Sequence, residues 1–350
     1  MKIAMLISGG VDSSVALRLL KQSGDHDITA FYLKIWLEDE LAALGNCPWE
    51  EDLRYVRAVC ETAGVPLHII SLQAEYHARI VDFAISELAA GRTPSPDIQC
   101  NSRIKFGAFF EKIDNTFDKV ATGHYARVEQ RGNQYALLRA LDPVKDQTYF
   151  LSRLRQDQLA RALFPIGHLP KKDVRMLARQ FDLPNQDRPD SQGICFLGKI
   201  KFPDFVRFHL GQRPGDIVDA ESKQILGRHE GYWFYTIGQR QGIGLGGGPW
   251  YVVRKDVTSN TVYVAHAPQR SAQARHVFEV SDVHWINDPP EAAKLLLRVR
   301  HGPNLTGCTL RTLDSDRLEV TMNEPDPGIA PGQSAVFYDN EVCLGAGTIV

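Results

Sequence analysis

Two cysteines lie in polar stretches of the chain where a thiol could react. Cys100 ends the proline-punctuated stretch 92–100, just before a helical pattern, and Cys195 lies in the glycine-flanked stretch 190–198. The thiolate is the reactive form of cysteine, and basic neighbours or a helix N-terminus lower the pKa of the thiol. A single cysteine of this kind would be interpreted as a structural thiol. Two in polar loops of one domain favour thiol chemistry at an exposed site.

A second chemical signal is the string S-G-G-V-D-S-S, residues 8–14, directly after the first apolar run. Two glycines leave backbone N–H groups open at a helix N-terminus, where the helix dipole favours an anion. Ser13 and Ser14 add hydroxyl groups, and Asp12 could hold the Mg²⁺ that accompanies phosphates. An ordinary glycine turn with a Ser or Asp cap is the alternative. The loop carries no G-x-x-x-x-G-K-[ST] string, so transfer of a γ-phosphate is not indicated.

The elements that position these residues alternate between strand-like and helical patterns. Apolar runs predict strands over 2–7, 27–36, 67–72 and 119–125. Recurrence of apolar residues every three to four positions predicts helices over 12–22, 49–63, 76–90 and 104–113. This order predicts a doubly wound parallel sheet with helices on both faces, and ligands at the carboxyl ends of its strands.

The pattern changes after about residue 205. Short alternating segments separated by glycine appear at 217–218, 232–237, 250–253 and 261–265. A second β-rich series begins near Val277, ends with 334–338 and 342–350, and contains a stretch at 323–332 that reads as a long turn. We therefore expect an α/β domain over 1–204, a central β-rich domain over 205–273 and a C-terminal β-rich domain over 274–350.

Bulk composition excludes several classes of protein. The 350 residues are 43% hydrophobic and 23% charged, as in globular proteins, and the net charge of -2 excludes a globally basic nucleic-acid binder. No apolar run approaches a membrane span, and the N-terminus resembles neither a signal nor a transit peptide, so we expect a cytoplasmic protein. The six cysteines form no C-x-x-C pair, which argues against a disulfide framework, a zinc site or an iron–sulfur cluster.

The loop over 8–14 resembles the PP-loop of the ATP pyrophosphatase superfamily, whose members cleave ATP between the α- and β-phosphates. Further segments extend the resemblance almost end to end, and with them the chain is identified as a member of the tRNA-uridine 2-sulfurtransferase family. Those segments are 91–101, 122–127, 145–151, 164–167, 190–198, 234–240, 242–247 and 331–338.

The resemblance implies a PP-loop, Rossmann-like domain followed by two small β modules, the last a β-barrel. It implies ATP-dependent 2-thiolation of the wobble uridine, position 34, of tRNA. In that reaction the C2 carbonyl oxygen is adenylated, AMP and pyrophosphate are released, and sulfur comes from a cysteine persulfide. ATP with Mg²⁺ would be the co-substrate, and no permanently bound metal or iron–sulfur cluster is expected. The partners would be tRNA and a sulfur donor, a cysteine desulfurase acting directly or through a carrier protein.

The same resemblance assigns roles to particular residues. Cys195 would carry the persulfide, Cys100 would resolve it by forming a disulfide or assist its attack, and Asp97 would act on or orient the target base. ATP would be bound by Leu6, Ile7, Ser8, Gly9, Gly10, Val11, Asp12, Ser13, Leu33 and Gly123. RNA would be bound by Ser95, Pro96, Asp97, Lys145, Asp146, Gln147, Arg298 and Arg300. For the charged clusters among these, a solvated face is an equally good interpretation of the spacing.

Two positions depart from the family pattern, and rival functions stay open. Ser95 stands where the family usually has asparagine, and Leu33 where methionine is usual. Serine still offers a hydrogen bond and leucine still packs on an adenine, so we expect altered detail and retained activity. The alternatives are thiolation of another RNA position, an amide-forming ligase, and an inactive tRNA-binding or redox-sensing protein. A ligase would not need the two cysteines.

Overall fold

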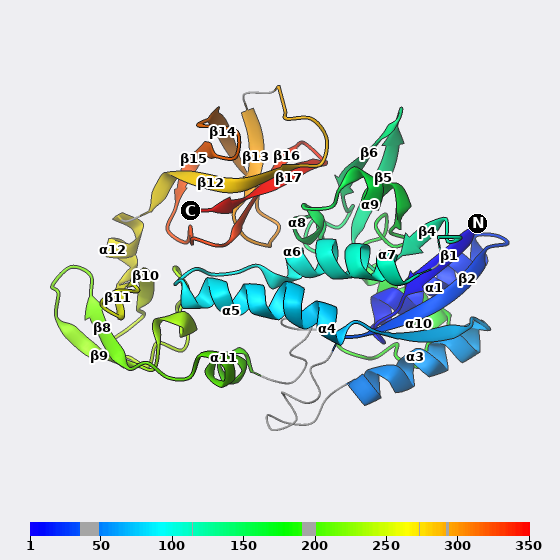
Figure 1. The fold of residues 1–350 in the computed structure, drawn as a ribbon, viewed down its shortest axis with the longest axis horizontal. Helices are drawn as coiled ribbons and strands as arrows, with labels where there is room; N and C mark the ends of the chain where they lie inside the picture. The colour runs from blue at the N-terminus through cyan, green and yellow to red at the C-terminus, as the bar shows by residue number, and fades with distance from the viewer. Residues whose placement is uncertain (36–48, 114, 191–200, 273, 292–293) are drawn as a thin grey trace.

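The computed structural model describes residues 1–35, 49–113, 115–190, 201–272, 274–291 and 294–350. Three sheets account for its strands: a parallel sheet near the N-terminus, a small sheet in the middle of the chain, and a large antiparallel sheet formed mostly by the C-terminal part (Figure 1). Cys47 and Cys195 lie outside the described residues.

The first sheet is parallel throughout and has the strand order β3-β2-β1-β4-β7. Its strands are β1 (Lys2–Leu6), β2 (Asp27–Lys34), β3 (Leu67–Ser71), β4 (Lys119–Ala121) and β7 (Ala162–Leu163). The first four strands were predicted with the correct first residue, but each predicted strand ended one to four residues beyond the observed end. β7 was not predicted, because two residues are too few to show a period.

Helices cover both faces of this sheet, which confirms the doubly wound fold. Ile3 and Met5 of β1 belong to one buried cluster, together with residues of the helices on one face. Ala4 and Leu6, the alternate residues, belong to the other cluster. Helices with buried residues in the first cluster are α1 (Val11–Gln22), α3 (Trp49–Ala63) and α10 (Lys171–Gln180). A strand buried on both sides needs such an uninterrupted apolar run.

Two continuous helical segments, called the first and second rod below, cover the opposite face of the sheet. The first runs through α4 (Gln73–Tyr76), a π-helical turn (His77–Val81) and α5 (Asp82–Ala89). The second runs through α6 (Pro96–Cys100), a π-helical segment (Asn101–Ala108) and α7 (Phe109–Lys112). The second rod was predicted to begin only at Ile104. It begins eight residues earlier because Pro96 occupies the first helical turn, where its missing N–H costs nothing.

The middle of the chain forms a four-stranded sheet of order β10-β11-β8-β9. Its strands are β8 (Gly215–Asp219), β9 (Ile225–His229), β10 (Tyr251–Asp256) and β11 (Thr261–Ala265). Two helices, α11 (Phe202–Leu210) and α12 (Ala267–Ala272), flank it and were not predicted. The segment 232–237, read as strand-like, contains the 3-10 turn Tyr232–Phe234 between two glycines with positive φ, Gly231 and Gly238.

Six C-terminal strands close into a barrel, as expected, because the first strand pairs with the last. They are β12 (Arg275–Trp285), β13 (Lys294–Arg298), β14 (Thr306–Thr312), β15 (Leu318–Asp326), β16 (Ser334–Asp339) and β17 (Val342–Ile349). The predicted long turn over 323–332 is partly wrong, since β15 runs to Asp326.

A hairpin from the N-terminal part extends the barrel sheet. Its strands are β5 (Ala126–Arg131) and β6 (Gln134–Arg139), and β6 pairs with β17 through Leu138 and Val342. Between the hairpin and β7 lie the short helices α8 (Thr148–Leu151) and α9 (Gln156–Arg161). The first and last modules therefore share one hydrogen-bonded sheet, which the sequence did not indicate.

Candidate active site

The predicted phosphate loop follows the carboxyl end of β1, the strand that lies between β2 and β4 in the sheet. The strand order reverses at this point, since β2 and β3 extend the sheet on one side and β4 and β7 on the other. In open α/β sheets such a switch point leaves a crevice that holds the ligand. The loop over 8–14 therefore stands where the sequence analysis placed it.

The loop folds back on itself and leaves the start of α1 uncapped. The Ser8 N–H donates to Ser13 Oγ at 3.3 Å, and the Ser14 hydroxyl donates to the Gly10 carbonyl at 3.0 Å. Gly10 is the N-cap of α1, and no side chain caps the helix. The first amide groups of a helix lack partners within it. This helix N-terminus is thus arranged to receive an anion.

Gly123, which follows β4, lies directly against this helix start. A Cβ atom at Gly123 would lie 2.6 Å from the Ser13 nitrogen and 2.9 Å from the Asp12 carbonyl carbon. Backbone cannot yield as a flexible side chain can, so any larger residue here would push the loop and the strand apart. The structure thus places Gly123 against the phosphate loop, and its role in nucleotide binding stays a prediction.

Two side chains missed by the sequence analysis hold the loop from the other side. The buried Asn185 amide donates to the Gly9 carbonyl at 2.8 Å and to Ser14 Oγ at 2.9 Å. Arg188 Nη1 donates to the same Gly9 carbonyl at 3.0 Å, and the arginine is also ion-paired with Asp52. The contacts with the loop span more than 170 residues of sequence and the Arg188–Asp52 pair spans 136, so no local pattern could reveal them.

Asp12, the predicted magnesium ligand, already has two donors on one carboxylate oxygen. The Tyr125 hydroxyl donates to Asp12 Oδ1 at 2.9 Å, and Lys171 Nζ donates to the same oxygen at 2.7 Å. Burial, followed by the charge of Asp12, raises the pKa of Tyr125 far above its usual value, so the hydroxyl stays a donor. The Asp12 side chain is therefore held at the helix start and remains partly exposed.

Asp190 forms a second acidic centre beside Asp12. It accepts from Lys145 at 2.8 Å and from Lys171 at 2.8 Å, and it is also paired with Arg175. Burial alone would raise the pKa of this carboxyl group, but the bonds from the two lysines outweigh burial and hold it well below its usual value. Asp190 immediately precedes the undescribed segment 191–200 that contains Cys195.

The residues around the loop fit a nucleotide with its magnesium ion. An uncapped helix N-terminus, the exposed Ser8 hydroxyl and a partly exposed carboxylate are groups that bind phosphates and Mg²⁺, whereas the buried Ser13 and Ser14 hydroxyls both donate to the Gly10 carbonyl. Magnesium keeps several waters and phosphate oxygens as ligands, so one carboxylate is sufficient. Within the described ranges, no three His, Cys, Asp or Glu side chains are grouped as a metal site.

Leu6, Ile7 and Val11 are buried, and Leu33 of β2 is half-buried against the core. Leu6 and Ile7 precede the loop, Val11 lies within it, and Leu33 belongs to the neighbouring strand β2. Their side chains contribute mainly to packing. Hence the loop's polar groups come from its serines, its backbone and Asp12.

The segment with Asp97 and Cys100 differs from its prediction. Cys100 was expected in a loop with an exposed thiol, but it closes α6 and is only 1% exposed. It lies beyond the first helical turn, and so it does not stand at the helix N-terminus. Asp97, one turn earlier, is partly exposed and lies on the same side of the helix. Cys100 can react only after this region opens.

The remaining described cysteines are buried, as expected for structural thiols. Burial raises the pKa of Cys60 to about 11 and that of Cys308 to about 12, and it also raises the pKa of Cys343. All three therefore stay protonated near neutral pH. They provide matched controls for any test of Cys100.

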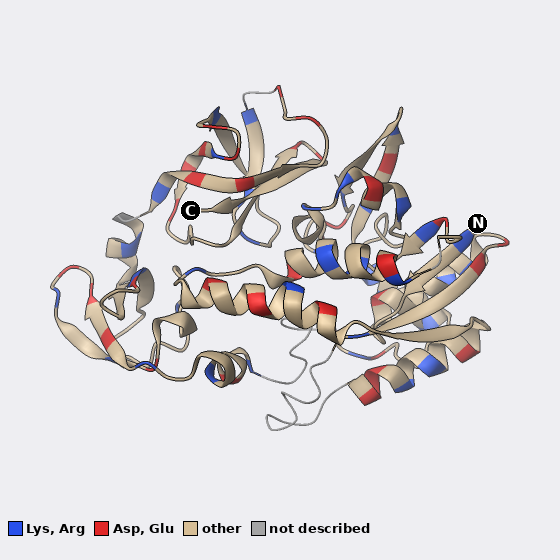
Figure 2. Ribbon diagram, viewed as in Figure 1, with Lys and Arg blue, Asp and Glu red and all other residues tan. Residues whose placement is uncertain are grey.

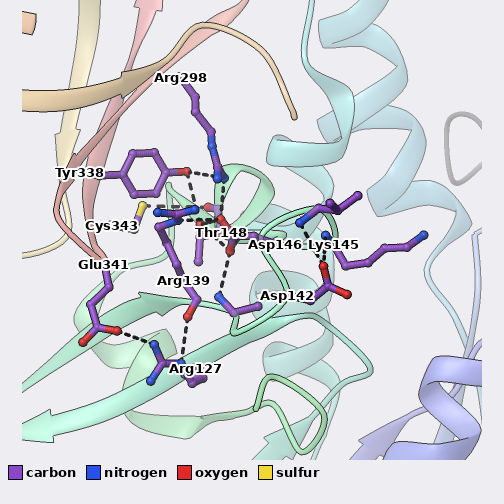
Figure 3. A network of polar contacts seen from close by, with 12 residues as sticks. Arg127, Arg139, Asp142, Lys145, Asp146, Thr148, Arg298, Tyr338, Glu341 and Cys343 are labelled. Carbon is purple, nitrogen blue, oxygen red and sulfur yellow. Dashed lines mark hydrogen bonds and ion pairs between the residues drawn. The ribbon is translucent and has the colours of Figure 1, made fainter. Parts of the chain in front are cut away.

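Asp146 and Arg298, both predicted to contact RNA, are buried in this structure and not exposed as that prediction requires. Arg298 Nη1 lies 2.5 Å from Asp146 Oδ2, and both side chains are completely buried (Figure 3). Asp146 also accepts from the Thr148 hydroxyl at 3.0 Å and from the Ala140 N–H at 3.1 Å. These residues instead form a buried ion pair between the hairpin region and the barrel. A charge cluster in sequence does not reveal which of its members face solvent.

The other predicted RNA contacts are at least partly exposed, apart from the buried Pro96. Lys145 is bound to Asp190, and Gln147 accepts from the Tyr125 N–H at 2.9 Å. Arg300 is 48% exposed and paired with Asp326. In Figure 2 basic residues are interspersed with acidic ones in every module, so RNA contacts must be local.

The three modules meet beside the segment with Ser95 and Asp97. The Thr93 N–H donates to the Pro331 carbonyl of the barrel at 2.7 Å, and the Thr93 hydroxyl lies 3.3 Å from the Thr236 hydroxyl of the middle module. Tyr149, a hydrogen-bond partner of Ser95, donates to the Ser334 carbonyl at 3.1 Å. Contacts among the three modules therefore lie at residues that precede Asp97 closely in the sequence.

Comparison with known families covers nearly the whole chain. Residues 1–199 match a family described as the tRNA methyl transferase HUP domain. Residues 203–266 match the tRNA methyl transferase PRC-barrel domain, and residues 275–349 match the aminomethyltransferase β-barrel domain. No helix in the described ranges combines the length and apolarity that crossing a bilayer requires.

Relatives that match this chain over nearly its full length carry names that refer to tRNA thiolation. The tRNA-specific 2-thiouridylase MnmA of Parabacteroides distasonis is 44% identical over 100% of this chain and 99% of its own length. The protein of that name from Shewanella amazonensis is 41% identical over 99% of this chain and 94% of its own. The U34-tRNA thiolase NcsA of Methanococcus maripaludis is a weaker structural match, with 18% identity, a TM-score of 0.36 and coverage of 55% and 61%. That last likeness carries no argument.

Proposed function

Because the chain belongs to the tRNA-specific 2-thiouridylase family, we propose that it replaces the C2 oxygen of the wobble uridine, position 34, with sulfur. Membership makes it an enzyme of tRNA modification, a sulfur transferase. Two of the matching domain families have the term methyl transferase in their descriptions, but each of them matches a single domain of this chain. The thiouridylase relatives match the chain from end to end. The observation that carries the proposal is this similarity over the full length together with the intact phosphate loop at the carboxyl end of β1, where the strand order reverses.

In the first step, ATP activates the uridine. The C2 oxygen attacks the α-phosphorus, a new P–O bond forms, and the electron pair of the α–β bridge leaves with pyrophosphate. The residues from Ser8 to Ser13 and Gly123 would hold the phosphates, and Leu33 would pack on the adenine. Asp12 would hold Mg²⁺, which lowers the charge on the departing pyrophosphate.

In the second step, sulfur replaces the activated oxygen. Cys195 carries a persulfide, whose outer sulfur attacks C2 and expels AMP. The Cys100 thiolate then attacks the inner sulfur, so that a Cys100–Cys195 disulfide forms and the outer sulfur stays on the base. A thiol reductant must reduce this disulfide before the next turnover. Asp97 orients the base or moves a proton beside it.

Partners and domains follow from the same proposal. The substrates are tRNA and ATP, and the sulfur donor is a cysteine desulfurase or a carrier protein that it loads. We propose the domain limits 1–204, 205–273 and 274–350, and a cytoplasmic place of action, where tRNA and ATP are found. Ser95, Pro96, Lys145, Gln147 and Arg300 remain proposed RNA contacts.

The decisive experiment combines the purified chain with tRNA, Mg-ATP and a persulfide donor, followed by mass spectrometry of the digested nucleosides. We expect a 2-thiouridine derivative at position 34, with AMP and pyrophosphate released only when tRNA is present. Sulfur at another position would point to a different thiolase. AMP formation with ammonia or an amine as acceptor would point to a ligase, and tRNA binding without AMP would point to an inactive binder.

A further inference from the structure

The loop between β13 and β14 places a histidine of the barrel on the aromatic side chains of α8. The His301 ring stacks on Phe150, with ring centroids 4.6 Å apart and planes inclined by 27°. The Tyr149 ring lies 6.3 Å from the His301 ring and 5.5 Å from the Phe150 ring, so both aromatic rings lie toward the same side of the imidazole. His301 is nevertheless exposed, and its exposed surface therefore belongs to the opposite side. Neither proposed step has given this stack a role.

Helix α8 holds the stack beside the helix that contains Asp97. The Phe150 carbonyl accepts from the Asn101 side-chain amide at 3.0 Å, and Asn101 is only 3% exposed. The neighbouring residue, Tyr149, is a hydrogen-bond partner of Ser95. Ser95 and Asn101 flank α6, in which Asp97 lies, so α8 is fixed at both ends of that helix. In Figure 1, α8 lies between α6 and the barrel.

The charge of Asp97 reaches the His301 ring. Partial burial lowers the pKa of His301 below its usual value, and the charge of Arg298 acts in the same direction. A hydrogen bond to the Asp146 backbone and the charges of Asp146 and Asp97 raise this pKa without outweighing burial. The imidazole is therefore neutral near pH 7. A neutral imidazole offers an aromatic face to a base but no charge to a phosphate.

A nucleotide that enters a site beside Asp97 leaves a gap in the stack of its own loop. The adjacent bases then lose a stacking partner, and proteins commonly hold such unstacked bases on aromatic side chains. Stacking on an aromatic ring strengthens binding without depending on the identity of the base. The exposed side of His301, close to the residue proposed to orient the target uridine, is a surface of this kind.

We propose that His301, backed by Phe150, is the stacking surface for a base adjacent to the target uridine in the tRNA. The inference rests on the proposed function, because it assumes that the uridine is bound beside Asp97. The stack replaces the contact that the adjacent base gives up when the uridine turns out of the loop, and so it holds the uridine in the site. His301 acts on the reaction only through the tRNA and is a positioning residue.

The test uses full-length protein and full-length tRNA with a single 2-aminopurine directly before or directly after the target uridine. Stacking quenches the fluorescence of this base, so one of the two probes should be at least about twofold dimmer on wild type than on His301→Leu. Leucine still covers Phe150 but has no aromatic face. His301→Tyr should keep the quenching. His276→Leu, which changes another exposed histidine of the barrel, is the control and should match wild type.

A second measurement separates stacking from a phosphate contact. His301→Leu should weaken tRNA binding about fivefold or more, because a stacked base is lost. The slope of log affinity against log salt should stay unchanged, since a neutral ring releases no counterions. A smaller slope would indicate a phosphate contact and overturn the inference. Binding by His301→Tyr as weak as that by His301→Leu would overturn it too, because the aromatic face would then not matter.

Equal brightness of both probes on wild type and His301→Leu, with the target uridine still thiolated by wild type, would overturn this inference alone. Thiolation at another position of the tRNA would instead overturn the proposed function.

Discussion

Among single residues, the cysteines differ most clearly in their surroundings. Cys60, Cys308 and Cys343 are buried thiols with raised pKa values, and Cys100 is buried as well, but it lies three residues after the partly exposed Asp97 in α6. Its proposed reaction with Cys195 requires Cα atoms about 4.4–6.8 Å apart at the moment of sulfur release. Binding of tRNA beside Asp97 is the event that would open this region.

We predict that Cys195→Ser accepts no persulfide and forms no thiolated tRNA. Cys100→Ser should accept the persulfide and stall at transfer, because no thiolate then resolves it. Wild type without reductant should stop near one turnover, trapped as a disulfide. Single-turnover assays with a ³⁵S-loaded donor measure each step, and Cys308→Ser is the matched control, expected to keep full activity. Wild-type rates in Cys195→Ser would refute the relay.

At the scale of elements, the loop after β1, the end of β4 and the start of α1 behave as one unit. Gly9 has φ +78°, and a Cβ atom there would lie 2.8 Å from the Asp52 carbonyl oxygen. Gly123 needs no unusual φ but has no room for a side chain. The proposed nucleotide site would thus depend on two glycines for two different reasons.

We predict that Gly123→Ala raises the KM for ATP at least roughly tenfold, since displacing the loop loses one or more charge-assisted hydrogen bonds. Steady-state pyrophosphate release at saturating tRNA measures this. Gly246→Ala is the control, because Gly246 has no positive φ and a Cβ atom there would meet nothing within 4 Å. An unchanged KM in Gly123→Ala would mean that the nucleotide does not rest on this contact.

At the scale of the whole molecule, the barrel is joined to the N-terminal domain by a shared sheet and a buried ion pair. Strand β17 pairs with β6, and Arg298 of the barrel is paired with Asp146, 152 residues away in sequence (Figure 3). Deleting the chain after about residue 275 would therefore damage the N-terminal domain as well. Single substitutions are the sharper way to separate stability from RNA binding.

We predict that Arg298→Met lowers the free energy of unfolding by as much as about 3–5 kcal/mol, because it removes the fully buried cation paired with Asp146 and leaves the longer contact with Arg139 Nε, at 3.4 Å, as the ion pair of that carboxylate. The double variant Arg298→Met with Asp146→Asn should cost less than the single one, since no buried charge remains. Urea unfolding followed by fluorescence gives both values. A double variant that is less stable than Arg298→Met would show that the buried charge is not the cause.

Arg300→Met is the exposed counterpart of the buried Arg298→Met. Arg300 is half-exposed, so its ion pair with Asp326 should contribute less than about 1 kcal/mol to the free energy of unfolding. We predict unchanged stability, weaker tRNA binding, and a plot of log affinity against log salt whose slope is smaller by about one. Arg311→Met is the control, because Arg311 is equally an exposed partner of a carboxylate, Glu319. An unchanged slope in Arg300→Met would remove this residue from the RNA surface.

The sequence by itself determined those helices, strands and loops whose formation depends on residues close to one another along the chain. Helix Trp49–Ala63 and strand Thr261–Ala265 have the predicted bounds, because apolar periodicity and flanking glycine and proline are local signals. The phosphate loop was equally readable, since one continuous string supplies its glycines, its hydroxyls and its place after a strand. The family resemblance rests on such strings too.

Only the tertiary structure decided which side chains face solvent and which distant groups meet. Asp146 and Arg298 looked like surface charges and are buried together, and Cys100 looked exposed and is buried. Lys171 and Asp12 meet across 159 residues. Periodicity tells which face of an element is apolar, but the partner that covers this face is chosen by packing among elements far apart in the chain. For that reason the loop was predicted and the cations around it were not.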